Sequence, residues 1–398
     1  MTAPLGLEEA QARLLALAPL LPPETVATEA ALGRFLAEDI RAARTQPPAD
    51  LSAMDGYALA GDEGPWTLVG ESRAGAPYRD VLSPGECVRI STGAIVPPGA
   101  DRVLLQEDAA DEAARITATE TPPPGRHIRA RGFDFHAEDL LLAKGTRLTP
   151  ARIALALAGG HGDIGVVRRP HVAVMDSGDE LAADPAHCLP HQIPASNAAM
   201  IAAMLAPLGC EVTRIGPVPD DREALAAALA LAEGADILIT SGGASVGDHD
   251  LIKPALVDWG ADIAFWKIAI KPGKPLLVAT RPRVNEGDQV ILGLPGNPVS
   301  SFVTAFLFAL PLVRAALGDP APLPPATTLR AGEDLPPIGP RREFLRACIE
   351  GETVRLAGSQ DSSALSALAA ADALIDRPAH STALPGGSPV RAFLLRNG

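Results

Sequence analysis

Between residues 170 and 316 the sequence alternates short apolar runs with longer segments of helical length, and this alternation constrains the fold more than any other feature. The apolar runs lie at 171–175, 211–215, 236–240, 264–270, 276–279 and 290–294. The helix-length segments lie at 197–208, 221–233, 250–259 and 298–313. Strands that alternate with helices in this way form βαβ crossovers. The sequence therefore predicts a doubly wound, mostly parallel α/β domain over residues 170–318.

The N-terminal forty residues predict helices. Apolar residues recur there at three- and four-residue steps, as is typical of one helical face, at Leu7, Ala10, Leu14 and Leu17. Pro22-Pro23-Glu24 predicts the start of a second helix. Another helix is predicted after the N-cap Thr149, with Pro150 in its first turn and Gly159 at its end. We expect these helices to pack together, so that 1–44 and 138–169 form one helical domain.

Short strands are predicted in the two remaining parts of the chain. β-rich runs alternate with Pro/Gly turns at 66–69, 87–90, 102–106 and 115–118. This pattern predicts a small β domain over residues 45–137, inserted into the helical domain. A proline-rich linker at 319–325 begins the last domain, 319–398, whose short strands predict a small β-barrel or sandwich.

The composition limits what the protein can bind and where it acts. The formal net charge is −14, which repels phosphate backbones, so we expect no nucleic-acid binding. The four cysteines are far apart and form no C-x-x-C pair, as suits a reducing compartment. The N-terminus does not resemble a signal peptide, and the longest apolar stretch, 302–313, is too short to span a bilayer. We expect a soluble, cytoplasmic protein.

Glycine-bearing turns follow three of the predicted parallel strands. They lie at 176–180, 241–250 and 295–298. Ligands of open parallel sheets bind beyond the carboxyl ends of the strands, so these turns predict a ligand site. Their backbone N–H groups can approach an anion, while Glu180 and Asp250 can hold a hard cation such as Mg²⁺. The alternative is that they are ordinary turns in which carboxylates cap helices.

Basic residues gather in two places despite the acidic total. Lys267, Lys271 and Lys274 lie close together in the chain, and a second group consists of Arg126, Arg129 and Arg131. In so acidic a protein, such clusters favour a small anionic ligand, for example phosphate or another oxyanion. Solvated ion pairs with neighbouring acids are the alternative, and charge alone does not decide between the two.

Three other patterns match known motifs poorly. The G-x-G-x-x-G string at 160–165 follows a predicted helix rather than a strand, so it indicates a helix end. The G-x-S-x-G string at 243–247 follows a strand, but the chain has no well-placed histidine for a hydrolase triad. His187 and His191 flank Pro190 and lack further metal ligands nearby, which favours a loop.

A polar turn opens the inserted domain. The string SAMDGYA occupies 52–58, and STGA occupies 91–94. An exposed β-turn around Asp55 is the direct interpretation. Nothing in the periodicity makes this turn catalytic.

Taken together, the strings resemble the molybdopterin molybdenumtransferase family, which includes bacterial MoeA and the gephyrin E domain. The resemblance covers essentially the whole chain. It rests on SAMDGYA at 52–58, STGA at 91–94, RGFD at 131–134, SGDE at 177–180, SGGASVG at 241–247 with Asp250, AIKPGKP at 269–275 and GLPGNPVS at 293–300. The sequence departs mildly from the family at Phe133, where an acid is expected, and at Ser177, where threonine is frequent.

This resemblance implies a fold and an assembly. The fold is a multidomain α/β plus β arrangement with a helical segment, an inserted β domain, an α/β domain of the molybdopterin-binding type and a C-terminal β-barrel. The assembly is an elongated homodimer whose active cleft forms between the α/β domain of one subunit and the β domain of the other. Such an arrangement explains why the turn around Asp55 should matter.

The resemblance also implies a reaction. Adenylylated molybdopterin and molybdate, the substrates, give molybdenum cofactor and AMP with Mg²⁺ as cofactor. The implied metal ligands are Asp55, Glu180 and Asp250, and further catalytic positions are Thr92, Asp134 and Asp220. The substrate anions are expected to bind Lys267, Lys271, Lys274, Ser241, Gly242, Gly243, Ser245, Gly247, Pro295, Gly296, Asn297 and Pro298. The departure at Phe133 leaves the role of Asp134 open, and the sequence does not distinguish molybdate from tungstate.

Two alternative functions stay open from the sequence. One is a non-catalytic molybdopterin-binding or scaffold paralogue, and the other is a molybdopterin adenylyltransferase, whose fold the α/β domain resembles. The absence of a long linker opposes the first, and the extra domains oppose the second. The resemblance further implies transient contact with the adenylyltransferase and with maturation factors of molybdoenzymes.

Overall fold

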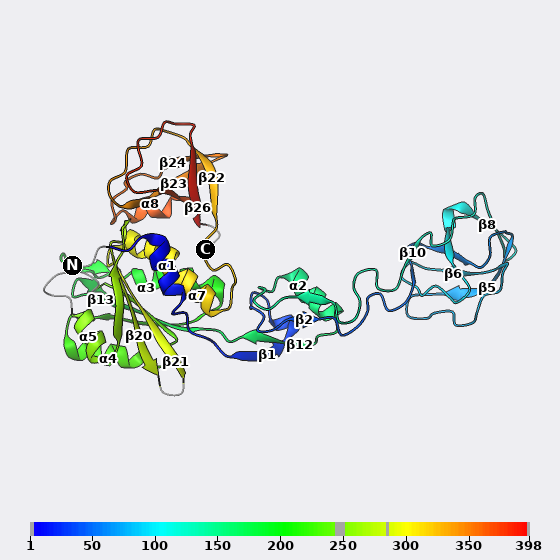
Figure 1. The fold of residues 1–398 in the computed structure, drawn as a ribbon, viewed down its shortest axis with the longest axis horizontal. Coiled ribbons are helices and arrows are strands. Elements are labelled where there is room, and N and C mark those ends of the chain that lie inside the picture. The colour runs from blue at the N-terminus through cyan, green and yellow to red at the C-terminus, as the bar shows by residue number, and fades with distance from the viewer. Residues whose placement is uncertain (1–3, 243–250, 284–285, 396–398) are drawn as a thin grey trace.

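The computed structural model describes residues 4–242, 251–283 and 286–395. The molecule is elongated (Figure 1). The α/β domain lies at one end with the C-terminal domain packed on it, the inserted β domain lies at the other end, and a small middle domain lies between them. The path of the chain therefore separates the two regions to which the sequence assigns functional residues.

Within the described residues, the α/β domain is built on a six-stranded sheet of order β16-β13-β17-β21-β20-β18. Its strands are β13 (His171–Ser177), β16 (Glu211–Val218), β17 (Ile237–Ser241), β18 (Asp262–Lys267), β20 (Pro275–Arg283) and β21 (Glu286–Leu294). Strands β16, β13, β17 and β21 run parallel, as predicted. Strand β20 is antiparallel to β21 and β18. The connection from Arg283 to Glu286 is too short for a crossover, so β20 and β21 must run antiparallel.

Helices cover both faces of this sheet. One face is covered by α1 (Leu7–Leu15), α3 (Asn197–Leu205), α6 (Pro298–Thr304), the π-helical turn η4 (Ala305–Ala309) and α7 (Leu310–Ala316). The other face is covered by α4 (Arg222–Leu231) and α5 (Ile252–Asp258). Along β13, Val172 and Val174 belong to the first core and Ala173 and Met175 to the second. Alternate residues of a strand point to opposite faces, so both faces of this sheet are buried.

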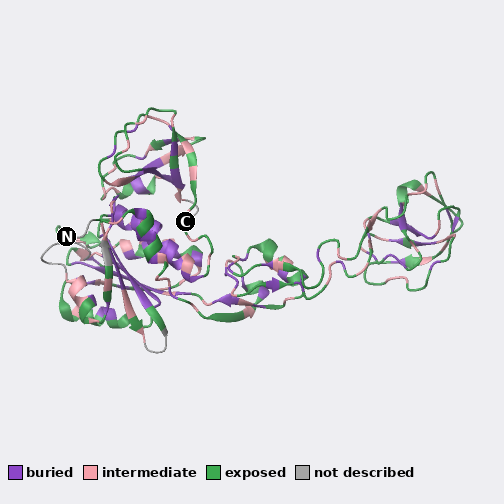
Figure 2. Cartoon of the chain, in the orientation of Figure 1, coloured by how far each residue is buried: buried purple, intermediate pink, exposed green. Residues whose placement is uncertain are grey.

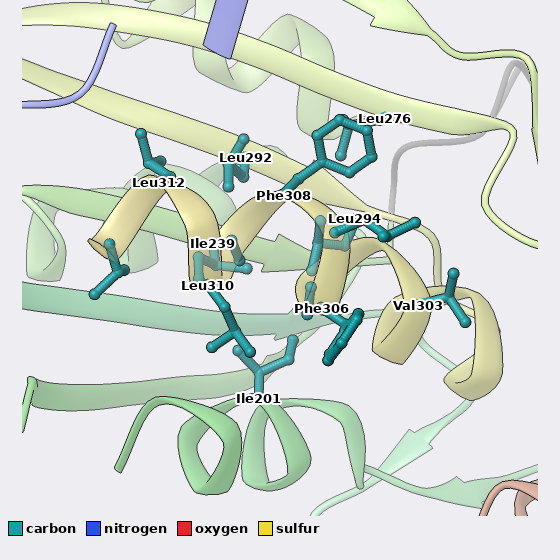
Figure 3. Packing of buried hydrophobic residues seen from close by; sticks show 14 of the residues in the cluster. Ile201, Ile239, Leu276, Leu292, Leu294, Val303, Phe306, Phe308, Leu310 and Leu312 are labelled. Carbon is teal, nitrogen blue, oxygen red and sulfur yellow. The ribbon is translucent and has the colours of Figure 1, made fainter. Parts of the chain in front are cut away.

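The continuous helical segment formed by α6, η4 and α7 is the most apolar in the chain. By length and composition alone the segment 298–316 could cross a membrane, and it is the one such helix among the described residues. Figure 3 shows its side chains, including Phe306, Phe308 and Leu310, packed against the strands of the sheet and α3. Its apolar character is therefore accounted for by the protein core.

The prediction of helices throughout the first forty residues is wrong after α1. Where Pro22-Pro23-Glu24 predicted a helix, the chain forms β1 (Pro23–Ala27), which pairs antiparallel with β12 (Asp163–Val167). The partner strand is distant in sequence, so local patterns do not reveal it. We expected helix α1 to pack on the helix that follows Thr149. It instead joins the core of the α/β domain through Leu7, Ala10 and Leu14.

The middle domain joins the two ends of the inserted segment. Strand β2 (Ile40–Arg41) pairs with β11 (Leu140–Leu142), and α2 (Pro150–Ala158) packs beside them. The Thr149 hydroxyl accepts a hydrogen bond from the Arg152 N–H, as the predicted N-cap requires. Gly159 ends the helix, and Gly160 after it has φ +102°, a conformation that favours glycine. The G-x-G-x-x-G string therefore begins at a helix end, as predicted.

The inserted domain contains a sheet of order β7-β4-β6-β5-β9-β8. Its strands are β4 (Gly56–Leu59), β5 (Trp66–Ser72), β6 (Glu86–Ile90), β7 (Arg102–Leu105), β8 (Ala109–Glu112) and β9 (Arg115–Ala118). All four strands predicted in this domain are present. A short pair formed by β3 (Leu51–Ser52) and β10 (Ile128–Arg129) lies where the chain enters and leaves. Trp66 is buried in one of the two small cores.

The C-terminal domain is a closed barrel. Strands β23 (Arg342–Glu350), β24 (Thr353–Leu356), β22 (Ala326–Ala331), β26 (Pro389–Leu394) and β25 (Ala373–Arg377) follow one another, and β25 pairs back with β23. Helix α8 (Leu365–Ala369) follows the loop at 359–363. Strand β19 (Ile270–Lys271) of the α/β domain pairs with β23. Figure 2 shows buried residues concentrated in the α/β domain and inside this barrel.

Candidate functional site

The carboxyl ends of the parallel strands form a cavity, as the topology predicted. Register pairs Asp176 with Ser241 and Ser241 with Leu294, so the turns that follow β13, β17 and β21 lie side by side at one edge of the sheet. A cavity of about 980 Å³ opens at this edge. Its volume is at the upper end of the range typical of small-molecule sites.

Most of the residues predicted to bind anions meet at this cavity. Those that line it are Ser241, Gly242, Lys271, Lys274, Pro295, Gly296, Asn297 and Pro298, together with the predicted metal ligand Glu180. Lys267 lies in β18 and is not among the described lining residues. Four predicted residues, Gly243, Ser245, Gly247 and Asp250, lie outside the described residues.

The C-terminal barrel supplies one wall of the cavity. This wall consists of Arg341, Gln360, Asp361, Ser362, Ser363 and Leu365. The Asn297 side-chain N–H donates to Ser362 Oγ at 3.1 Å, and Lys271 Nζ lies 3.0 Å from Glu343 Oε1. Sequence reasoning missed this wall, because it forms only when the barrel packs on the α/β domain.

The floor of the cavity holds two polar residues that the sequence did not single out as site residues. Asp176 is 3% exposed, and its Oδ2 accepts a hydrogen bond from the Ala198 N–H at 3.0 Å. Asn197 donates through Nδ2 to Ser241 Oγ at 2.9 Å and to the Gly296 carbonyl at 2.7 Å. Burial raises the pKa of Asp176, although the Ala198 N–H and Arg214 partly oppose the shift.

The residue at position 242, beside this floor, must be glycine, because two backbone turns approach each other closely there. Gly242 has φ +99°, and a Cβ there would lie 2.4 Å from the Ser177 carbonyl oxygen. Any other residue would displace the turn that follows β17. Glycine therefore lets the turns that follow β13 and β17 pack closely together beside the cavity.

Carboxylates gather at the rim of the same edge. The Asp220 N–H donates to Asp179 Oδ1 at 3.0 Å. Partial burial and the negative charges of Asp179 and Glu180 raise the pKa of the Asp220 carboxyl. A cation bound here would relieve this repulsion.

The described carboxylates of the rim do not form a complete metal site by themselves. Among the described residues no three His, Cys, Asp or Glu side chains are arranged as a metal site. Mg²⁺ is often held by one or two carboxylates and completed by substrate phosphates and water. Glu180 and Asp220 fit that role. The predicted ligand Asp250 lies outside the described residues.

In the inserted domain, the structure joins the two predicted motifs. Asp55 Oδ1 accepts a hydrogen bond from the Thr92 N–H at 2.6 Å, and both residues are exposed. Ser52 Oγ donates to the Met54 carbonyl at 2.6 Å and braces the turn. A Cβ at Gly56 would lie 1.9 Å from the Leu104 carbonyl oxygen, so the turn must end in glycine. Asp55 is therefore held at the surface by its surroundings.

The third predicted residue of this domain lies where the connecting segments pair. The Asp134 N–H donates to the Gln46 carbonyl at 3.0 Å. Figure 1 shows the inserted domain far from the α/β domain of the same chain. A single chain therefore does not bring Asp55, Thr92 and Asp134 to the cavity that Glu180 lines.

Family comparisons cover nearly the whole chain. Residues 5–160 match the MoeA N-terminal region (domain I and II), and residues 173–315 match a probable molybdopterin binding domain. Residues 328–395 match the MoeA C-terminal region (domain IV). The three matches occur in the order expected from the resemblance.

Individual relatives agree with these matches. The chain is 36% identical over 388 residues to the molybdopterin molybdenumtransferase of Nostoc sp., covering 94% of this chain and 88% of the relative. It is 33% identical to the enzyme of that name from Bacillus subtilis, covering 99% and 94%. A crystal structure of the molybdopterin biosynthesis protein moeA from Pyrococcus horikoshii OT3 superposes with a TM-score of 0.84 at 26% identity, covering 98% and 100%.

Proposed function

Because this chain belongs to the MoeA family of molybdopterin molybdenumtransferases, we propose that it inserts molybdate into adenylylated molybdopterin in a Mg²⁺-dependent reaction that releases AMP. The protein is a transferase of molybdenum cofactor biosynthesis. One observation carries the proposal. The cavity at the strand ends combines cationic side chains, hydroxyl groups and a carboxylate rim within reach of one small molecule.

The cationic wall suits a tetrahedral oxyanion. Lys271, Lys274 and Arg341 line the cavity together with the hydroxyl groups of Ser362 and Ser363. Charge-assisted hydrogen bonds are strongest where water is excluded, and preorganised donors stabilise negative charge without rearrangement. We therefore place molybdate at this wall, and the same chemistry accepts tungstate.

The carboxylate rim suits the phosphate end of the substrate. When bound, Mg²⁺ would polarise the phosphoanhydride that joins AMP to molybdopterin. Glu180 and Asp220 would hold the ion together with the phosphate oxygens. Gly242 lines the cavity, so we place the nucleotide phosphate beside the backbone of this turn.

We propose that the inserted domain acts on the cavity of a second subunit in a homodimer. Asp55 and Thr92 form a preformed exposed pair that lies far from the cavity of their own chain (Figure 1). Apolar side chains lie exposed next to the predicted residues of this domain, and the largest of them, Phe133, is 74% exposed. Met54 and Ile95 are exposed as well. Such side chains would be covered by a partner subunit, with Asp55, Thr92 and Asp134 completing the cleft.

The first experiment tests the reaction. The purified protein, given adenylylated molybdopterin, molybdate and Mg²⁺, is expected to release AMP in proportion to molybdenum cofactor formed. Absence of AMP release with authentic substrate would rule out the proposed reaction for this chain.

The second experiment tests the shared site. Assayed at subsaturating molybdate, Asp55→Asn and Lys274→Ala chains are each expected to keep only a small fraction of wild-type activity, whereas co-expression gives mixed dimers with one intact site. Random pairing makes about one quarter of all sites intact. If the co-expressed sample is as inactive as either variant, the residues do not work across a dimer.

Location and partners follow from the same proposal. We expect a cytoplasmic enzyme with small-molecule substrates. We also expect transient contact with the adenylyltransferase that supplies the substrate and with maturation factors that receive the product.

A further inference from the structure

Buried oxygen atoms on the floor of the cavity lack hydrogen-bond partners among the described residues. They are Asp176 Oδ1, Ser177 Oγ and Asn197 Oδ1. Buried polar atoms of this kind are nearly always hydrogen-bonded in folded proteins. Asp176, Ser177 and Asn197 all line the cavity. Their unmet hydrogen bonds therefore point to a ligand with donor groups.

The surrounding contacts fix Asn197 Oδ1 as an acceptor and orient Asp176 Oδ1, which accepts in the carboxylate form. The Gly296 carbonyl can only accept, so the Asn197 group facing it must be the N–H and Oδ1 stays an acceptor. Asp176 is held by the Ala198 N–H through Oδ2, which leaves Oδ1 oriented and without a partner. Ala198 follows Asn197 directly, so both acceptors lie at the start of α3.

The cavity is thus divided by hydrogen-bonding character. Lys271, Lys274 and Arg341 present donors and positive charge to one part of the cavity, where Asp361 of the barrel is the neighbouring carboxylate. The floor formed by Asp176 and Asn197 presents acceptors. A ligand that fills both parts must carry an anionic group at one end and a row of N–H donors at the other.

We propose that Asp176 and Asn197 form the specificity-determining contact with the pterin ring of the substrate, accepting hydrogen bonds from its 2-amino group and the adjoining ring N–H. This inference rests on the proposed function and adds which residues distinguish the heterocycle. An adenine ring fits less well, because its amino group lies beside a ring nitrogen that is itself an acceptor. The pterin edge presents donors in a row and matches the two fixed oxygens.

The test measures binding of three separate probes to the full-length protein by titration calorimetry. The probes are pterin itself, AMP and molybdate. In Asp176→Asn the amide oxygen can keep the Ala198 N–H, which turns the amide NH₂ toward the ligand and replaces an acceptor by a donor. We expect pterin affinity to fall at least about tenfold while AMP and molybdate affinities change less than about twofold.

A matched control comes from the opposite wall. Arg341→Gln removes a positive charge from the same cavity and is expected to weaken molybdate while leaving pterin unaffected. Two results overturn the inference: unchanged pterin affinity in Asp176→Asn, or a loss confined to AMP, which would place the adenine on the floor.

A change in the ligand tests the same contact without changing the protein. Lumazine carries a carbonyl oxygen where pterin has the 2-amino group, and its N1 carries a hydrogen where N1 of pterin is an acceptor. The wild-type protein should bind it at least about tenfold more weakly than pterin, since an acceptor would then face the floor. Equal binding of the two rings refutes the inference even if Asp176→Asn does not fold.

Kinetics separate this inference from the proposed function. With adenylylated molybdopterin, Asp176→Asn should raise KM and leave kcat close to wild type, because the contact is equal in the ground and transition states. If wild-type protein binds pterin through Asp176 but releases no AMP, the reaction is wrong and the contact stands. If it releases AMP and Asp176→Asn keeps its pterin affinity and KM, only the contact is wrong.

Discussion

The cavity of the α/β domain and the turn around Asp55 both gather polar residues, but they are assembled in different ways. The cavity depends on contacts between segments far apart in sequence, as between Asn297 and Ser362, and its floor is buried. The Asp55 turn is braced by its own small domain and lies exposed. The difference indicates that the cavity can bind ligands within one chain. Under the proposed function, the turn acts only on a ligand that a partner subunit holds.

The largest expected effect is a loss of stability in the α/β domain that the inserted domain does not share. Asp236 is 2% exposed at the amino end of β17, away from the cavity, and its carboxylate accepts from Arg168 at 2.9 Å and from Arg283 at 3.2 Å. Removing one member of a buried ion pair costs about 3–5 kcal/mol. We expect Asp236→Ala to destabilise the α/β domain by that amount and leave the inserted domain, with its buried Trp66, unaffected.

The pH dependence of this effect has a definite sign. Burial raises the pKa of Asp236, but hydrogen bonds from Arg168, the His171 N–H and Arg283 outweigh it and hold the pKa below its ordinary value. The stabilisation is present above the pKa of the unfolded chain and is lost as pH falls toward the folded value. Urea unfolding at several pH values should therefore show wild type and Asp236→Ala converging in acid. A constant difference down to the lowest pH would contradict the assigned ion pair.

The next largest effect is a loss of turnover without a loss of ligand affinity. Asp55→Asn keeps the shape of the turn and an oxygen for the Thr92 N–H, yet removes the negative charge. We expect turnover to fall about 10²–10³-fold, the usual cost of losing one electrostatic contact in a transition state. Molybdate and pterin affinity, measured by calorimetry, should stay at the wild-type value. If Asp55→Asn binds molybdate or pterin more weakly than wild type does, the turn and the cavity do not bind these ligands independently.

The sequence predicted the cavity for a reason that holds for any open parallel sheet. Strand and helix alternation fixes the topology, and topology fixes the edge at which Ser241 and Pro295 must lie. The barrel wall at 359–363 and the acceptor pair on the floor depend on packing between distant segments, which no local pattern records. Strand β1 was mistaken for a helix for the same reason, since its partner β12 follows about 140 residues later.

The Asp55 turn shows the opposite limit. Its conformation follows from local residues, and an exposed turn was predicted. Its role was implied only by resemblance to a family, because an exposed carboxylate in a turn is common in any protein. The hydrogen bond to Thr92 brings together two strings about forty residues apart, which no local pattern predicts.

A smaller effect distinguishes the two lysines of the cavity. Lys271 is paired with Glu343 of the barrel, whereas Lys274 forms no ion pair within the described part of the chain. A free ammonium can give its full charge to an oxyanion. We expect Lys274→Ala to weaken molybdate binding about 10- to 100-fold, the value of a charged hydrogen bond, and Lys271→Ala to do so less. The reverse order, measured by calorimetry, would place the anion nearer the barrel.

The smallest expected effect concerns how the barrel holds its wall. Arg346 is 1% exposed, and its Nη2 donates to the carbonyls of Ser359 at 2.9 Å and Asp361 at 3.0 Å. The Gln360 side chain accepts a hydrogen bond from the Arg346 N–H and donates one to the Arg346 carbonyl. The loop that lines the cavity is thus tied to the inside of the barrel by the Arg346 guanidinium and by the Gln360 side-chain amide.

Arg346→Lys keeps the positive charge but cannot reach both carbonyls in one plane. Losing one such hydrogen bond corresponds to about a threefold to tenfold rise in the KM for molybdate, with kcat and pterin affinity unchanged. Arg330→Lys, on strand β22 of the same barrel, serves as the control and should leave all three values at wild type. If Arg346→Lys changes pterin affinity as strongly as molybdate, the barrel supports the whole cavity. The cavity would then not consist of one part that binds molybdate and another part that binds the pterin ring.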